Sequence, residues 1–72
     1  MTQTLSGTVA ANIRAEAARR RKTQAQLAEA AGLSQFAISR RMREEFPFTL
    51  DEVQAIADFL GVPLSDLLNT AA

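Results

Sequence analysis

The chain has 72 residues, with eight basic and eight acidic side chains and neither cysteine nor histidine. A chain of this length forms one domain that buries only about 60% of its unfolded surface, for which a helical bundle is the economical solution. The missing residue types exclude disulfides, thiolate metal sites, zinc chemistry and catalysis by a histidine base, and we expect no cofactor. With no run of about 18 apolar residues and no signal-peptide pattern, we expect a cytoplasmic protein that does not bind membranes.

The first predicted helix covers residues 8–21 and packs through one apolar stripe. Residues at i, i+4 and i+8 form this stripe, namely Val9, Ile13 and Ala17. Before it, residues 1–7 are polar and carry no cation, so we expect a flexible N-terminal arm. The helix ends in the most basic run of the chain, residues 19–22.

Residues 23–43 carry the signals of two short helices joined across one glycine. Thr23 and Gln26 form the capping box that starts the first of them, and Gly32 ends it because glycine takes a left-handed conformation at no steric cost. Ser34 caps the second helix, which is predicted over residues 34–43. Helices joined by so short a turn cross steeply. The pattern therefore predicts a helix-turn-helix that places its second helix in the major groove of DNA.

The outward face of the helix over residues 34–43 carries side chains suited to base edges. Ile38 and Met42, four residues apart, turn inward. Arginine suits the O6 and N7 edge of guanine, glutamine the N6 and N7 edge of adenine, serine several edges, and an exposed aromatic ring a thymine methyl group. For Phe36, a place in the core or in a dimer contact is the alternative. The predicted base-contacting residues are Gln35, Phe36, Ser39, Arg40 and Arg43.

The basic run and the helix starts that follow it are predicted to hold the DNA backbone. Free N–H groups and the positive end of a helix dipole favour a phosphate, and nearby cations add charge-assisted contacts. We expect these contacts to give affinity and register rather than sequence choice. In the alternative interpretation, the run merely complements the dipole of the first helix. The predicted phosphate-contacting residues are Arg20, Arg21, Lys22, Thr23, Gln24, Ser34 and Arg41.

Two further helices follow the helix-turn-helix. Thr49 and Glu52 form a second capping box, so the fourth helix starts at Leu50, and Gly61 ends it. Pro63 then restarts the chain. The brief fifth helix bears three leucines, Leu64, Leu67 and Leu68.

Together these elements predict an all-α, compact five-helix bundle over residues 8–68 with a C-terminal tail over residues 69–72. Its charge is unevenly spread. Residues 1–45 carry eight basic and four acidic side chains (8 − 4 = +4), whereas residues 46–72 carry four acidic side chains and no base (0 − 4 = −4). The helix-turn-helix lies in the basic part, as a nucleic-acid partner requires. Chance segregation on an ordinary solvated surface is the alternative.

The ordered set of short motifs resembles the lambda-repressor-like helix-turn-helix family, also called the Cro/C1 or xenobiotic-response-element type. The resemblance implies a sequence-specific double-stranded DNA-binding transcriptional regulator, a repressor that pairs as a homodimer on operator half-sites about 34 Å apart. It further implies a phage Cro-type protein, the DNA-binding part of a phage immunity repressor or an antitoxin autoregulator, acting at the nucleoid. The motifs are Thr23-Gln24-Ala25, Leu27-Ala28, Gly32-Leu33-Ser34, Ile38-Ser39-Arg40, Ile56-Ala57 and Leu60-Gly61-Val62.

One position departs from the family pattern. Where many members carry an apolar residue three positions after the one that matches Ile38, this chain has Arg41. The main base-contacting residue is therefore either Arg40 or Arg41. We favour Arg40, because it continues the outward face at helical spacing.

A protein-interaction module is the second functional hypothesis. Phe46, Phe48 and the C-terminal leucines would then form a surface for a partner protein, although closure of the core is the commoner fate of leucines at this spacing. An enzyme is not expected, because isolated carboxylates without histidine, cysteine, a metal cluster or a Gly-rich phosphate loop form no catalytic constellation.

Overall fold

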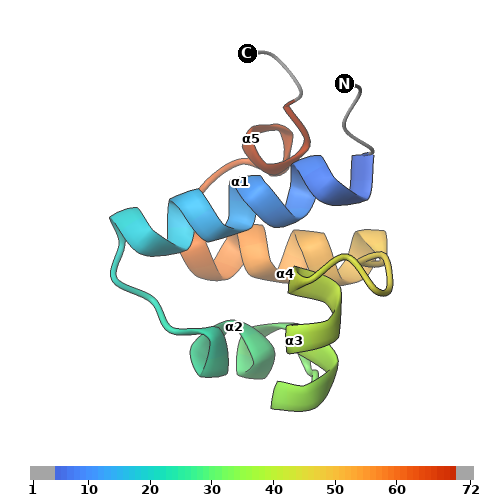
Figure 1. The fold of residues 1–72 in the computed structure, drawn as a ribbon. Helices are drawn as coiled ribbons and strands as arrows, with labels where there is room; N and C mark the ends of the chain where they lie inside the picture. The colour runs from blue at the N-terminus through green and yellow to red at the C-terminus, as the bar shows by residue number, and fades with distance from the viewer. Residues whose placement is uncertain (1–4, 70–72) are drawn as a thin grey trace.

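The computed structural model describes residues 5–69, apart from the side chain of Ser6, and these residues form five helices and no strand. Helix α1 lies between α4 and α5, and α2 and α3 lie on the side of the bundle away from α5 (Figure 1). This arrangement confirms the predicted all-α five-helix fold. The helices are α1 (Leu5–Arg19), α2 (Gln24–Ala31), α3 (Gln35–Met42), α4 (Leu50–Leu60) and α5 (Leu64–Leu68).

Helices α2 and α4 start with the predicted capping boxes. The Thr23 hydroxyl accepts a hydrogen bond from the backbone N–H of Gln26 at 3.1 Å, and the Gln26 side chain accepts one from the Thr23 N–H at 2.8 Å. Thr49 and Glu52 make the same reciprocal pair at 3.1 and 3.0 Å. The Ser34 hydroxyl caps α3 by accepting from the third residue of that helix at 3.0 Å. These bonds satisfy N–H groups that the helix leaves without partners.

Four helix ends share one hydrogen-bonding pattern, although only two of them contain glycine. Gly32 and Gly61 have φ values of 71° and 74°, as predicted. Arg21 and Glu44 also take left-handed conformations, with φ values of 54° and 66°. At Arg21, the next N–H, that of Lys22, donates to the carbonyl five residues back at 2.9 Å. This is the Schellman pattern of helix termination, and it ends α1 at residue 19 rather than at the predicted residue 21.

Helix α1 also begins earlier than the sequence indicates. Its first residue is Leu5 rather than Thr8, so residues 5–7 belong to the helix and not to the predicted arm. Gly7 and Thr8 are buried, and helical backbone there lets their carbonyls accept from N–H groups one turn later, where water does not reach them. The remainder of the predicted arm, residues 1–4, lies outside the described residues, as do residues 70–72 of the predicted tail.

Two polar side chains of α1 fix the ends of other helices. The Asn12 amide donates to the carbonyls of Leu67 and Asn69, at 2.9 and 3.0 Å, at the end of α5. The Arg14 guanidinium donates to the carbonyl of Met42 at 3.1 Å, at the end of α3. Helix α1 is anchored in the core by its predicted apolar stripe, and Arg14 joins it to the end of α3. Helix α1 therefore positions α3 against the rest of the bundle. The core residues are Val9, Ile13, Ala17, Leu27, Ala28, Ile38, Met42, Val53, Ile56, Ala57, Leu60 and Leu67.

Candidate nucleic-acid interface

Helix α3 presents the predicted outward face. Ile38 is fully buried and Met42 nearly so, which confirms the inward pair. Phe36 is 68% exposed, so its alternative place in the core is wrong. Of the other predicted base-contacting residues, Gln35 and Arg43 are exposed, whereas Ser39 and Arg40 are partly buried. The inward residues thus leave one face of α3 open to solvent.

Arg40 lies in a cluster formed by α3 and the turn that follows it. Its guanidinium carbon lies over the rings of Phe36 and Phe46, at 5.2 and 4.4 Å from their centroids. Its Nε donates to one carboxylate oxygen of Glu45 at 3.2 Å, while Nε of Arg43 donates to the other at 2.8 Å. The hydrogen bond from Arg43 and the positive charges of both arginines lower the pKa of Glu45 despite some desolvation. The two arginines predicted to contact bases are therefore joined through one carboxylate.

Arg41 points away from this face and toward α4. Its Nε donates to the Glu52 carboxylate at 2.9 Å, and its Nη1 donates to the Ala37 carbonyl at 3.3 Å. The two charged side chains are only 20% and 13% exposed. The same Glu52 oxygen also accepts from the Thr49 N–H in the capping box of α4. Arg41 therefore ties α3 to the start of α4.

The predicted phosphate-contacting residues around the end of α1 differ in their surroundings. Arg20 forms an ion pair with Glu16, which also binds Arg19. The ammonium of Lys22 lies over the ring of Phe59 on α4, 5.3 Å from its centroid. Arg21 is exposed and makes no ion pair with any residue that the structure describes.

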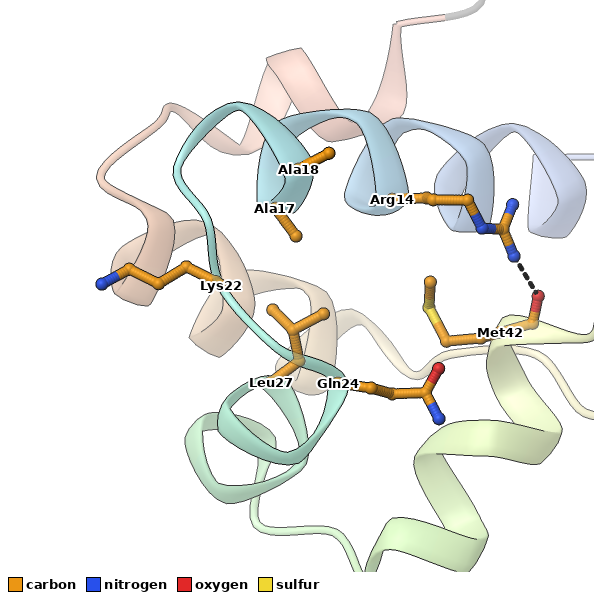
Figure 2. Close-up of a pocket in the computed structure, with 7 residues that line it drawn as sticks. All are labelled: Arg14, Ala17, Ala18, Lys22, Gln24, Leu27 and Met42. Atoms are coloured by element: carbon orange, nitrogen blue, oxygen red, sulfur yellow. Dashed lines mark hydrogen bonds between the residues drawn. The ribbon is translucent and has the colours of Figure 1, made fainter.

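The start of α2 faces a shallow pocket between α1, α2 and α3. Figure 2 shows Arg14 extending from α1 toward the end of α3, Gln24 directed toward the same opening, and Lys22 pointing away from it. Thr23 and Gln24 lie at the first turn of α2, and Ser34 lies at the start of α3, all of them exposed. Arg14 is not among the site residues predicted from the sequence. Its signal was a cation next to the apolar stripe of the first helix, at a position where a long side chain reaches a neighbouring helix.

The second predicted surface, of aromatic residues and leucines, is not continuous. Phe46 lies beside Arg40, whereas Phe48 lines an apolar depression elsewhere together with Leu68. Leu67 is fully buried, so it cannot contact a partner, and Leu64 is packed against the core. Closure of the core accounts for these leucines, as the spacing favours.

The described residues carry neither a cluster of metal-binding side chains nor a membrane-spanning helix. Within residues 5–69, no group of three or more metal-binding side chains lies together. In the same range, no helix has the length and apolar character needed to cross a membrane.

The fold and the exposed face of α3 are those of a helix-turn-helix protein. Helices α2 and α3 form the motif, and α3 carries basic, polar and aromatic side chains on its exposed face. The model of the helix-turn-helix family HTH_3, of Cro/C1 type, matches residues 13–67. The chain therefore belongs to this family, as its motifs indicate, and is a DNA-binding regulator by class.

A solved structure supports the same assignment. It is described as a hypothetical transcription factor, NHTF, from Neisseria, and it is similar to this chain with a TM-score of 0.83 at 28% sequence identity. The match covers 93% of this chain and 77% of that one. No curated protein matches the chain.

Proposed function

We propose that this chain is a sequence-specific repressor that places α3 in the major groove of double-stranded DNA. The observation that carries this proposal is the exposed face of α3, where Gln35, Phe36 and Arg43 are exposed to solvent and Arg40 lies beside Phe36. Glutamine and arginine offer the paired donors and acceptors that base edges match, and Phe36 offers an apolar surface for a thymine methyl group. In this proposal Arg40, rather than Arg41, is the main base-contacting residue. The engagement of Arg41 with Glu52 supports that choice.

The DNA backbone would be held beside α3 by the start of α2 and the end of α1. Exposed Gln24 at the first turn of α2 and exposed Arg21 just before it support this part of the proposal. N–H groups at a helix start and a free cation together favour a phosphate. Thr23 and Ser34 contribute their exposed helix starts. Arg20 and Arg41 would contribute only after exchanging their present carboxylate partners for phosphate, whereas Lys22, whose charge rests over the ring of Phe59 without a carboxylate, keeps its charge for phosphate.

The proposed assembly is a homodimer on DNA. One copy of α3 covers one half-site, and a two-fold pair of copies covers half-sites about 34 Å apart, one helical turn of DNA. Occupation of a promoter by such a pair represses it. Its place of action would be the nucleoid of a bacterium or of a phage-infected host.

The test of base contact is selection of bound duplexes from a random DNA pool at near-physiological salt, with Arg40→Ala in parallel. A two-fold symmetric site should be enriched, and the variant should lose about 1–3 kcal/mol at that site and relax one base position. Enrichment of no sequence by the unchanged chain would refute the proposal. Unchanged base preference in the variant would transfer the role to Arg41.

The test of phosphate contact uses Lys22→Met, which keeps an apolar side chain over Phe59 but removes the charge. We expect weaker binding to all duplexes by a similar factor and a salt slope smaller by about one unit. A loss confined to one DNA sequence would contradict the assignment.

A further inference from the structure

The turn after α3 brings its backbone back against Arg40. Glu44 takes a left-handed conformation, with φ of 66°, although it is not glycine. The following N–H, that of Glu45, donates to the Arg40 carbonyl at 2.9 Å, and the Glu44 N–H donates to the Arg41 carbonyl at 3.0 Å. Left-handed backbone at a residue with a side chain costs free energy and persists only where its surroundings hold it. The backbone of Glu45 is therefore fixed relative to Arg40.

The side chains of the same turn then hold the guanidinium of Arg40. Glu45 accepts from its Nε at 3.2 Å, and the ring of Phe46 lies 4.4 Å from its central carbon. Phe36, one helical turn earlier, adds a second ring at 5.2 Å. Arginine stacks readily on aromatic faces, and a stacked, hydrogen-bonded guanidinium has fewer orientations than a free one.

These contacts leave the terminal nitrogens of Arg40 available. Among the residues that the structure describes, Nη1 and Nη2 of Arg40 have no hydrogen-bond partner. A pair of neighbouring N–H donors is what a guanine O6 and N7 edge accepts. Nε of Arg40 is thus held by the protein, while Nη1 and Nη2 remain available to donate to a base.

We propose that Glu45 and Phe46 are positioning residues that hold Arg40 for recognition of a guanine. The proposal rests on the proposed function, since it requires that α3 contact bases. It goes beyond it by assigning sequence specificity to two residues that lie outside the helix-turn-helix. Neither residue touches the base in this proposal. Each restricts the orientation of Arg40, so that less conformational freedom is lost on binding.

The same ion pair has a competing interpretation. In this interpretation the Glu45 carboxylate does not position Arg40. It only occupies the arginines that DNA would otherwise bind, and its negative charge repels the DNA phosphates. In that case its removal would strengthen binding to every duplex and leave the base preference unchanged. The ratio of affinities for two sequences therefore distinguishes positioning from competition.

The experiment compares Glu45→Ala, Glu45→Gln and Phe46→Ala with a matched control, Glu44→Gln. Glu44 has the same charge, is exposed, and forms no ion pair with any of residues 5–69. The readout is the affinity for the selected site divided by the affinity for the same site with the guanine assigned to Arg40 changed to adenine. Circular dichroism melting of each variant shows that the fold is retained.

We expect Glu45→Ala and Phe46→Ala each to lower this ratio by about three- to tenfold, part of the discrimination that one bidentate contact provides. Glu45→Gln keeps an acceptor for Nε, so it should lower the ratio less than twofold. Glu44→Gln should leave the ratio unchanged. A ratio retained by Glu45→Ala, with tighter binding to both duplexes, would overturn the proposal in favour of competition.

Failure of the proposed function has a different signature. If the unchanged chain selects no sequence, the ratio is close to one for every protein, including Arg40→Ala. If the chain selects a site whose guanine depends on Arg40 but not on Glu45 or Phe46, only the positioning proposal fails.

Discussion

The ion pair between Arg41 and Glu52 should contribute to the stability of the domain, and Arg41→Ala tests it. The charged atoms are 2.9 Å apart, and the side chains are 20% and 13% exposed, which places the pair between surface and interior. Exposed pairs contribute about 0–1 kcal/mol, whereas removing one partner of a fully buried pair costs about 3–5 kcal/mol. Arg41 also donates to the Ala37 carbonyl. We therefore expect the variant to lose about 1–2 kcal/mol of unfolding free energy.

A double-mutant cycle isolates the ion pair from the other contacts. Glu52→Gln removes the charge but keeps an acceptor for the Thr49 N–H, so the capping box of α4 survives. Thermal and urea unfolding of the two single variants and the double variant should give a coupling energy of about 1 kcal/mol. For a domain of this size, the loss in Arg41→Ala corresponds to a melting temperature lower by roughly 4–16 °C.

Two results would refute this reasoning. A coupling energy below about 0.3 kcal/mol would mean that solvent screens the pair as it does on a surface. Full stability of Arg41→Ala together with a salt slope of DNA binding smaller by about one unit would instead return Arg41 to the phosphate contacts.

Three further predictions concern single positions. Glu44→Gly should raise the unfolding free energy by about 0.5–1 kcal/mol, because relief of left-handed strain exceeds the entropy that glycine adds to the unfolded chain; a lower urea midpoint would contradict this. Asn12→Ala should lower it by about 1–2 kcal/mol, since two carbonyls at the end of α5 lose their donor; an unchanged melting curve would mean that water replaces the amide. An NMR titration of Glu45 should give a pKa below its ordinary value of 4.5, mainly because Arg43 donates a hydrogen bond to the carboxylate. Arg43→Ala should therefore raise the pKa of Glu45. The pKa of Glu45 is lower in the folded state than in the unfolded state. The ion pairs of Glu45 with Arg43 and Arg40 therefore contribute to folding stability at pH values above 4.5, and this contribution is lost as the pH falls through the folded-state pKa.

The sequence predicts those features of the fold that depend on neighbouring residues. A threonine followed three residues later by glutamine or glutamate specifies a capping box whatever surrounds it, and both boxes form as predicted. Glycine after a helical pattern specifies a left-handed end, and Gly32 and Gly61 both adopt it. The inward pair of Ile38 and Met42 follows from helical spacing alone.

Features that join distant parts of the chain could not be predicted in this way. Arg41 meets Glu52 across 11 residues, and Arg14 meets the Met42 carbonyl across 28. Their contacts depend on how helices cross, which the local pattern does not define. The left-handed ends at Arg21 and Glu44 lack the glycine that would have marked them, so the predicted first helix ran two residues too far.

The arrangement of cations leads to a last prediction, on the salt dependence of DNA binding. If all four charged residues of the predicted phosphate set released counterions, the slope of log K against log salt would be about −3.6 for each bound copy. Arg20 and Arg41, however, are already paired with carboxylates, which leaves Arg21 and Lys22. We therefore expect a slope of about −1.8, measured by fluorescence anisotropy on a nonspecific duplex between roughly 50 and 200 mM salt. Glu16→Gln should free Arg20 and steepen the slope by about 0.9, whereas a slope near −3.6 in the unchanged chain would show that phosphate displaces the internal partners.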